Sequence, residues 1–317
     1  MDNGMTKARG SRRDVLMGAI GGVTAAVLPR AASAATPMRM QDPAWNRDAF
    51  ARIQGNLDFG KVKYGWYAGT VCGVRDGEAV RPLMGFEGFS CARLVDNGNG
   101  SYQKLLREVV YYKDLASGEI LETFLNPYTG EQVPVVPVTN DPFNIVIEQY
   151  YPKGPSYGGL RSQDEERRPM LLPWRITSPD TVTLATDIHL YYPSALKPEQ
   201  WPRESSGRFV RVSEMFRYVM RREDLEDPAK TSVQHTGSWS RITPWLPWML
   251  MGQAPGHVFY IGTMGGYDNL DMASANVIRY AEKHHPKFLD APTRWEEPSL
   301  SSLEDFARTQ KPAPLKK

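Results

Sequence analysis

Apolar and polar positions alternate through the middle of the chain, from about residue 64 to residue 263. Short runs rich in aromatic and β-branched residues are separated by turn signals, of which the DNGNG segment at residues 96–100 is the strongest. This pattern predicts strands, because alternate side chains of a strand face opposite sides of a sheet. The predicted strands are residues 64–74, 86–94, 102–113, 143–151, 175–176, 181–192, 208–220 and 257–261.

Helical patterns occur only near the two ends of the chain. Asp42 followed by Pro43 is typical of an N-cap with proline at the first helical position, which predicts a helix to about Gln54. Residues 273–283 have helical spacing. Residues 300–309 open with serines and early acidic residues, as helix starts do.

The order of these elements predicts the fold class. Many short strands, with no alternation of strands and helices, indicate a lipocalin-like antiparallel β-barrel or barrel-like sandwich. The same order disfavours a dinucleotide-binding α/β fold. We expect a single mainly-β domain over residues 35–317, with short N- and C-terminal helices and a helical tail at residues 270–317. The polar stretch at residues 152–173 is too long for a hairpin and is a candidate lid.

The first 34 residues have the form of a twin-arginine signal peptide. Arg12 and Arg13 lie in the segment SRRDVLM, a moderately apolar run follows at residues 15–28, and Ala-Ser-Ala at residues 32–34 is a small-x-small cleavage site. The alternative is a membrane-spanning helix, but the run falls short of the ~20 apolar residues that a span needs. We therefore expect export through the twin-arginine machinery, a periplasmic or secreted location, and no stable membrane span.

The charge balance gives no indication of a nucleic-acid partner. The formal net charge is +2, but residues 1–34 hold five of the 38 basic side chains and two of the 36 acidic ones. The remaining chain has 33 basic and 34 acidic side chains and therefore no excess of positive charge. Because a nucleic-acid footprint needs a basic patch or stripe, we expect no such partner. The sequence does not indicate an oligomeric state.

The two cysteines, Cys72 and Cys91, leave two alternatives open. In an oxidising compartment they could form a disulfide, and otherwise both are buried thiols in strand-like runs. No zinc-type spacing is present, and no local spacing supports a metal held by His189, His235 and His257. Walker, GxSxG and HExxH motifs are absent, and no GxGxxG follows a strand. We expect neither a cofactor nor a metal.

The most distinctive stretch is residues 235–268, which holds three of the eight tryptophans within ten residues. Pro244 and Pro247 remove backbone donors and fix φ, so the segment around them should be a stiff loop that leads into the strand at residues 257–261. Large aromatic side chains on a rigid loop either close the end of a core or line a pocket for an apolar ligand. The candidate ligand-binding residues are Trp239, Trp245, Trp248, Met249, Met251, His257 and Tyr191.

One predicted strand, residues 181–192, carries a polar set on one face. Asp187, His189 and Tyr191 occupy alternate positions opposite the apolar residues of the strand. An aspartate and a histidine two residues apart are neighbours, so the carboxylate could bias the tautomer of the imidazole and favour its charged form. The alternative is an ordinary solvated sheet face.

Another carboxyl, Glu214, lies in an otherwise apolar row of the strand at residues 208–220. Desolvation there would suit general acid–base work, whereas the alternative is an ion pair with an arginine from a neighbouring strand. His235 and His257 bracket the tryptophans and are either functional or simple hydrogen-bonded residues. The candidate catalytic residues are His235, His189, Asp187 and Glu214.

Three stretches resemble a bacterial and fungal family that is known only as a domain of unknown function and often has twin-arginine leaders. They are residues 111–141 (YYKDLASGEILETFLNPYTGEQVPVVPVTND), the strands ending in Tyr-Tyr-Pro, and residues 238–255 (SWSRITPWLPWMLMGQAP). The Pro-Trp-Leu-Pro-Trp-Met run is the most specific part, and the resemblance spans most of the chain after residue 34. It implies a shared fold and supplies neither an activity nor a catalytic residue.

Three functions are compatible with these features. The first is an exported lyase, isomerase or hydratase without a cofactor, which would hold an apolar or aromatic small molecule against the Trp and Met side chains and move a proton with His and carboxyl groups. The second is a periplasmic carrier that holds the same ligand without chemistry. The third is an interaction module with an exposed Trp loop. We favour the pocket over the module, and slightly favour the enzyme, because two histidines make the pocket more polar than storage requires.

Overall fold

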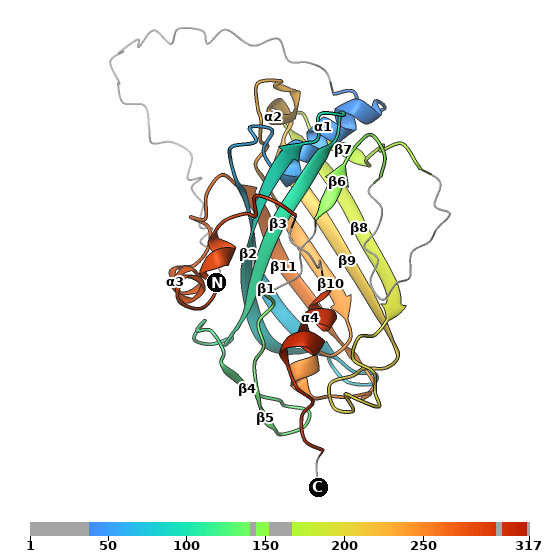
Figure 1. Ribbon diagram of the computed structural model, residues 1–317, viewed down its shortest axis with the longest axis vertical. Coiled ribbons are helices and arrows are strands. Elements are labelled where there is room, and N and C mark those ends of the chain that lie inside the picture. The colour runs from blue at the N-terminus through green and yellow to red at the C-terminus, as the bar shows by residue number, and fades with distance from the viewer. Residues whose placement is uncertain (1–37, 140–143, 152–166, 296–299, 316–317) are drawn as a thin grey trace, which may run out of the picture. The chain divides into compact units, whose positions relative to one another are not determined.

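One curled antiparallel sheet organises the unit Ala35–Lys317, of which the computed structural model describes residues 38–139, 144–151, 167–295 and 300–315. Nine strands of these residues belong to it: β1 (Lys63–Val74), β2 (Arg81–Asp96), β3 (Tyr102–Lys113), β6 (Ile145–Ile147), β7 (Trp174–Ser178), β8 (Thr181–Pro193), β9 (Phe209–Arg221), β10 (His235–Thr243) and β11 (His257–Tyr267). They hydrogen-bond in the order β6-β3-β2-β1-β11-β10-β9-β8-β7. The sheet is a half-barrel with β6 and β7 at its edges, which confirms the predicted mainly-β antiparallel class (Figure 1).

The curl of the sheet brings together side chains from strands that are not neighbours. Tyr112 of β3 and Tyr260 of β11 are separated in the sheet by β2 and β1, yet their hydroxyl oxygens lie 2.9 Å apart. Glycines occupy a tight point between β1 and β11, where Gly69 pairs with Gly262. A Cβ on Gly69 would lie 2.5 Å from the Gly262 Cα, so the two strands approach closely only because no side chain intervenes.

The helices form where the capping signals predict them. Asp42 Oδ1 accepts a hydrogen bond from the Ala44 backbone N–H at 2.9 Å, and Ser301 with Glu304 forms a capping box before the last helix. All three expected helices are confirmed, and the short α2 is one that the sequence pattern does not predict. None of the described helices is long and apolar enough to cross a membrane. The helices are α1 (Pro43–Gln54), α2 (Arg222–Glu226), α3 (Ala275–His284) and α4 (Ser302–Thr309).

Apolar side chains on the inner face of the half-barrel form two clusters. One cluster lies at the α1 end and includes Trp45. The other includes Trp245, Trp248 and Phe306 of α4, a helix that lies toward the opposite end of the strands (Figure 1). Tyr67 and Trp239 pack against both clusters, so these two rings connect the two halves of the core.

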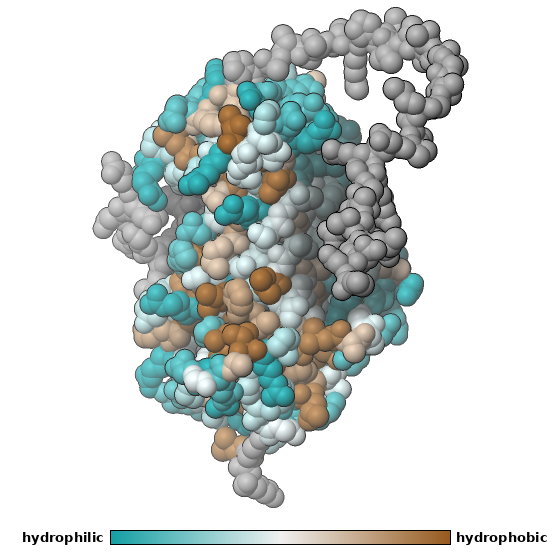
Figure 2. Space-filling model, turned by 180° about the vertical axis from the view of Figure 1, so that it is seen from behind, coloured by the Kyte–Doolittle hydropathy of each residue, from teal (hydrophilic) through white to brown (hydrophobic). Residues whose placement is uncertain are grey.

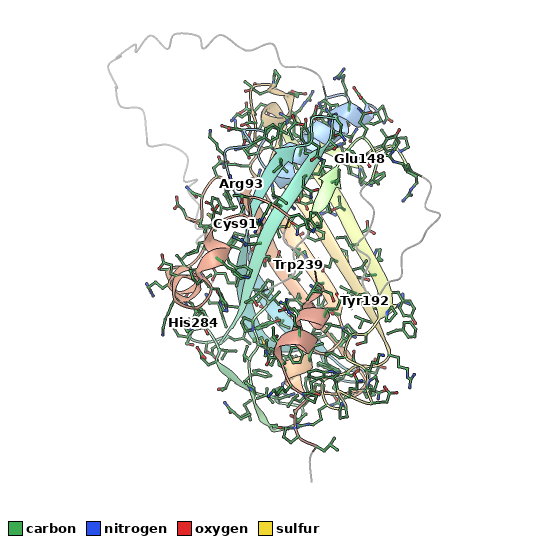
Figure 3. All side chains as sticks on the ribbon, in the orientation of Figure 1. Cys91, Arg93, Glu148, Tyr192, Trp239 and His284 are labelled. Carbon is green, nitrogen blue, oxygen red and sulfur yellow. The ribbon has the colours of Figure 1, made fainter. Side chains whose placement is uncertain are left out.

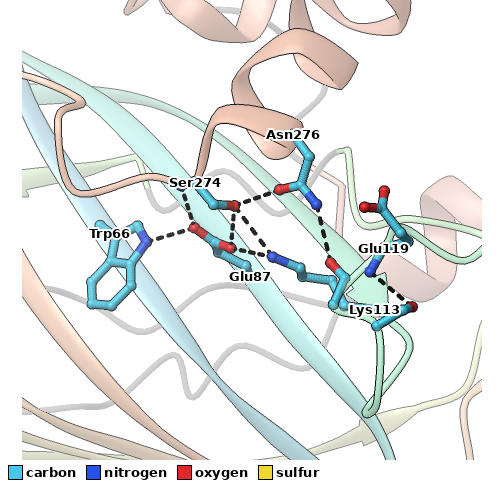
Figure 4. Close-up of polar contacts among 8 residues, drawn as sticks. Trp66, Glu87, Lys113, Glu119, Ser274 and Asn276 are labelled. Atoms are coloured by element: carbon cyan, nitrogen blue, oxygen red, sulfur yellow. Dashed lines mark hydrogen bonds and ion pairs between the residues drawn. The ribbon is translucent and has the colours of Figure 1, made fainter.

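On the outer face, a buried carboxylate fastens α3 to the sheet (Figure 4). Glu87 of β2 accepts hydrogen bonds from Trp66 Nε1 at 3.1 Å, from Lys113 Nζ at 2.7 Å and from the Ser274 backbone N–H at 2.7 Å. Burial alone would raise the pKa of Glu87, but the hydrogen bonds from Lys113 and Ser274 outweigh burial, and the pKa is lowered. The charged carboxylate also faces the N-terminus of α3, where the helix dipole favours it.

Local differences from the sequence prediction concern mainly the aromatic stretch. Residues 235–243 form β10, so Trp239 lies on a strand and not on the expected loop. The last strand along the chain, β11, continues past the expected end through Gly265 and Gly266. The strand expected at residues 143–151 is reduced to β6. Residues 152–166, which make up most of the candidate lid, lie outside the described residues.

The two cysteines are free and buried, so the thiol alternative holds and the disulfide is not formed. Cys72 pairs with Pro82 at one end of the β1–β2 ladder, whereas Cys91 pairs with Tyr64 at the other end. The length of β1 between Tyr64 and Cys72 is about 26 Å at ~3.3 Å per residue. A disulfide needs Cα atoms only about 5–6 Å apart.

Candidate functional site

The connection between β10 and β11, residues 244–256 and here called the Trp segment, folds back into the end of the half-barrel. It contains a 3₁₀ turn, η2 (Pro247–Met249), followed by Leu250 in the left-handed region with φ 55°. Trp245 and Trp248 are only 3% and 4% exposed. Trp245 Nε1 donates to the Ala254 carbonyl at 3.0 Å, which closes the segment on itself. The stiff aromatic conformation predicted around the two prolines is therefore present.

A buried amide holds the Trp segment in place. Asn126 lies in the connection between the short strands β4 (Thr123–Leu125) and β5 (Gln132–Pro134) and is fully buried. Its Nδ2 donates to the Met249 carbonyl at 2.7 Å and lies 3.3 Å from Met251 Sδ. Because a buried backbone carbonyl needs a donor, Asn126 stabilises the turn from outside the sheet.

A cavity of about 280 Å³ lies between the Trp segment, the inner face of the sheet and α4. This volume is near the lower end of the range for small-molecule pockets. The cavity-lining Tyr192 lies beside α4 in Figure 3, whereas His284 belongs to α3, which packs on the outer face. Most of the walls are apolar, and they include Trp245, Leu246, Trp248, Val210, Leu303 and Phe306.

One part of the cavity lining is rich in hydrogen-bond donors. Tyr112 and Tyr260 are 2% and 5% exposed, and their hydroxyls are hydrogen-bonded to each other at 2.9 Å. Arg241 of β10 also lines the cavity, and its Nη1 lies 3.1 Å from Glu214 Oε1 of β9. Burial raises the pKa of Tyr112, although the hydrogen bond with Tyr260 and the positive charge of Arg241 lower it in part. Burial also raises the pKa of Tyr260, so both phenols keep their protons at neutral pH and can donate them in hydrogen bonds.

A buried carboxyl lines the same cavity. Glu204 is 3% exposed, and its Oε1 accepts the Ala313 backbone N–H at 2.5 Å. Its Oε2 has no hydrogen-bond partner among the residues that the structure describes. An unsatisfied buried carboxyl oxygen destabilises a fold, so its presence in the wall of a cavity indicates a functional role for Glu204. Sequence reasoning missed Glu204 because it lies in the irregular connection between β8 and β9, where no periodicity marks an inward side chain.

The predicted polar set on β8 lies elsewhere. Asp187 Oδ2 and His189 Nε2 are 2.7 Å apart, and His189 Nδ1 lies 3.0 Å from Ser213 Oγ, so the two side chains are neighbours as expected. Both are about 60% exposed, on the outer face of the sheet. Tyr191 is 56% exposed and stacks on Phe209. None of the three predicted residues lines the cavity.

The two histidines that bracket the tryptophans lie at opposite ends of the β10–β11 pair. His235 pairs with Gly266 near α1, where it is buried against the Tyr218 ring at 5.0 Å. Burial, together with the charge of nearby Lys63, lowers the pKa of His235 to about 3, so the imidazole is neutral. His257 begins β11 at the end near the Trp segment and is half-buried. Neither histidine lines the cavity.

The other predicted residues divide between the cavity wall and the core behind it. Trp245 and Trp248 line the cavity. Trp239 lies mid-sheet (Figure 3), where its ring packs on Tyr260, and its Nε1 donates to Glu214 Oε2 at 3.3 Å. Met249 is fully buried behind the wall, and Met251 is partly buried near Asn126. The structure thus brings Trp245, Trp248 and, through Arg241, Glu214 to one region.

The histidines do not gather into a metal centre. His189, His235 and His257 lie on three different strands, and His189 faces the opposite side of the sheet from His235. Within the described parts of the chain, no three His, Cys, Asp or Glu side chains are grouped so that they could hold a metal ion.

Comparison with known proteins gives a family and no curated relative. No curated protein matches the chain. A family model matches residues 60–310, a span that includes every strand of the sheet, the Trp segment and all of the cavity-lining residues. The chain therefore belongs to the family described as "Protein of unknown function (DUF1838)".

Proposed function

We propose that this protein binds a small apolar or aromatic molecule in the cavity between the Trp segment and α4. The observation that carries the proposal is a cavity of about 280 Å³ whose walls are mainly aromatic and aliphatic. A preformed apolar cavity with a few polar groups is the usual form of a small-molecule site. A cavity of this size fits a compact ring system better than a long acyl chain.

The burial of the tryptophans argues against an interaction module. Trp245 and Trp248 are less than 5% exposed, so they cannot anchor a protein partner on a convex surface. On the face seen from behind, apolar side chains are scattered among polar ones, as on an ordinary protein surface (Figure 2). A ligand in the cavity is therefore the better use of the Trp segment.

A second candidate is an acid–base enzyme, a lyase or isomerase without a cofactor, acting in the same cavity. Its supporting observation is that a buried carboxyl, Glu204, lines the cavity together with the Tyr112–Tyr260 pair and Arg241. A carrier needs few ionisable groups, whereas proton transfer needs a base and a group that stabilises the charge that develops. On this proposal, Glu204 takes the role that the sequence reasoning gave to His235 and to the Asp187–His189 pair.

We also propose that the protein acts outside the cytoplasm. The support is the sequence of residues 1–34, with its paired arginines, apolar run and Ala-Ser-Ala site. These residues lie outside the described part of the chain. Export by the twin-arginine route would deliver the half-barrel already folded to the periplasm, where it would meet its ligand.

The binding proposal is tested by calorimetric titration of the purified full-length chain with tetralin, a compact bicyclic hydrocarbon. We expect saturable binding with one site per chain. The variant Val136→Trp should abolish binding, because Val136 lines the cavity and the larger ring fills it. Leu125→Trp is the matched control, because Leu125 is 60% exposed and does not line the cavity.

The same titration separates the alternatives. Equal binding by the two Trp variants would place the ligand outside the cavity. If neither tetralin nor its relatives 2-tetralone and tetralin-2-carboxylate binds, the proposal of a small apolar ligand is rejected. Native mass spectrometry of protein purified from its own compartment provides an independent check, since a co-purified organic molecule would identify the ligand class directly.

A further inference from the structure

The tyrosine pair in the cavity has one more hydrogen than its own contacts use. Tyr112 and Tyr260 carry two hydroxyl hydrogens, and the hydrogen bond between their oxygens uses one of them. The Trp248 ring packs against the Tyr112 ring with 5.2 Å between centroids, and its indole N–H can only donate, so it supplies no acceptor. The described residues therefore supply no acceptor for the second hydroxyl hydrogen, although both hydroxyls are buried in the cavity wall.

The charged groups around this pair decide which acceptor fits. Arg241 lines the cavity, but Glu214 already compensates its charge at 3.1 Å. Two further carboxyls, Glu204 and Asp305, line the same cavity, and so does His285, whose pKa is lowered by burial, which favours the neutral imidazole. The lining thus has no excess of positive charge, and an anionic ligand would have to be buried close to carboxyl groups.

We infer that the Tyr112–Tyr260 pair binds a neutral carbonyl oxygen of the ligand, so that the ligand class is a compact apolar ketone or related carbonyl compound. The inference rests on the proposed small-molecule function and names its substrate class. The free hydroxyl hydrogen donates to the carbonyl oxygen. The hydrocarbon part of the ligand lies against Trp245, Trp248 and the side chains of α4.

If the protein is an acid–base enzyme, the Tyr112–Tyr260 pair has a defined chemical role in the reaction. A hydroxyl that donates to a carbonyl oxygen stabilises the negative charge that develops there when a neighbouring C–H proton is removed. The same contact serves binding alone in a carrier. The inference about the ligand therefore holds for either function and is tested by binding.

The test compares three ligands of one ring skeleton by calorimetric titration of the full-length chain: tetralin, 2-tetralone and tetralin-2-carboxylate. We expect 2-tetralone to bind at least about tenfold more tightly than tetralin, because a buried donor then gains its acceptor. The carboxylate should bind more weakly than the ketone. The double variant Tyr112→Phe/Tyr260→Phe, which removes both hydroxyls, should reduce the advantage of 2-tetralone over tetralin to less than about threefold.

Tyr64→Phe is the matched control, because Tyr64 packs with the outer-face cluster beside α3 and does not line the cavity. It should keep the full preference for the ketone. Equal affinity of wild-type protein for tetralin and 2-tetralone overturns the carbonyl site and leaves the apolar cavity intact. Tightest binding of the carboxylate overturns the requirement for a neutral ligand. If none of the three binds, the proposed function itself fails. The comparison of ligands on wild-type protein does not depend on the folding of any variant.

Discussion

Arg241 Nη1 lies 3.1 Å from Glu214 Oε1 across the β9–β10 pair, and Trp239 Nε1 donates to the other oxygen of the same carboxylate. Each side chain of the ion pair is one-fifth exposed. The pair therefore lies inside the half-barrel, next to Trp239, one of the two rings that connect the apolar clusters. Glu214 fixes Arg241 in position, and Arg241 in turn lines the cavity.

Breaking this ion pair on one side should cost more than removing it altogether. We expect Glu214→Gln to lower the free energy of unfolding by about 2 kcal/mol, because the Arg241 charge loses its carboxylate in a mostly buried place. Urea denaturation of Glu214→Gln, Arg241→Met and the double variant measures the coupling. The double variant should be more stable than the sum of the single effects predicts. Additive effects would contradict a coupled pair.

The sheet was predictable because its strands are half-buried, so alternating positions record which side faces the core. In β8, for example, Val182 and Leu184 are buried while Asp187 and Tyr191 are exposed. Helix starts were equally predictable, since the Asp42 cap signal is local. The start of the Trp segment was not predictable, because Trp239 on β10 and the tryptophans after the prolines form one aromatic-rich stretch in the sequence.

The cavity could not be predicted from local patterns. Tyr112 and Tyr260 are 148 residues apart in the sequence, and only the curl of the sheet brings their hydroxyls together. Glu204 lies in a connection without periodicity, so its burial depends on packing against Ala313 far along the chain. The pattern of the strand predicted that Glu214 lies in an apolar row, with an arginine partner as one alternative, but only the register of β9 and β10 makes Arg241 that partner.

The buried His235 should make the protein sensitive to acid. Its pKa is lowered from 6.5 to about 3 by burial and by Lys63 and Lys104, so the unfolded chain binds a proton that the folded chain excludes. Stability from this group is complete above about pH 6.5 and is lost as the pH falls toward 3. We expect about 2 kcal/mol of loss between pH 7 and pH 5.

Urea denaturation at the two pH values tests this dependence. His235→Gln should lose about 2 kcal/mol less than wild-type protein over the same interval, because the variant has no group to protonate there. His189→Gln is the control, since the His189 side chain is about 60% exposed. The same pH dependence in wild-type protein and His235→Gln would mean that other groups cause the acid sensitivity.

Export should depend on the paired arginines of the leader. We expect Arg12→Lys with Arg13→Lys to keep the protein in the cytoplasm at its full length, because the translocation machinery recognises the arginine pair and not charge alone. Wild-type protein should appear in the periplasmic fraction without residues 1–34, as measured by fractionation and intact mass. Arg30→Lys, which preserves the pair, should be exported normally. Periplasmic accumulation of the double variant would reject this route.

Substitution of Glu204 should change both the stability of the protein and its affinity for the ligand, whereas substitution of His189 should leave the stability almost unchanged. Glu204→Gln removes a buried carboxyl whose Oε2 has no partner among the described residues, while the amide oxygen can still accept the Ala313 N–H. We expect Glu204→Gln to raise the free energy of unfolding by about 1 kcal/mol, because the buried carboxyl oxygen without a partner destabilises the fold. We also expect it to change the affinity for 2-tetralone at least about threefold, because functional groups are often retained at some cost in stability. His189→Gln should change stability by less than about 0.5 kcal/mol, because surface substitutions have small effects.

Thermal unfolding and calorimetric titration of the two variants decide between the two locations of the site. Glu199→Gln, in the same connection as Glu204 but 58% exposed, is the matched control and should change neither quantity. Loss of ligand affinity in His189→Gln, with normal stability, would move the function to the Asp187–His189 pair on the outer face. Loss of stability in Glu204→Gln would show that the carboxyl stabilises the fold, and the second candidate function would then lack its base.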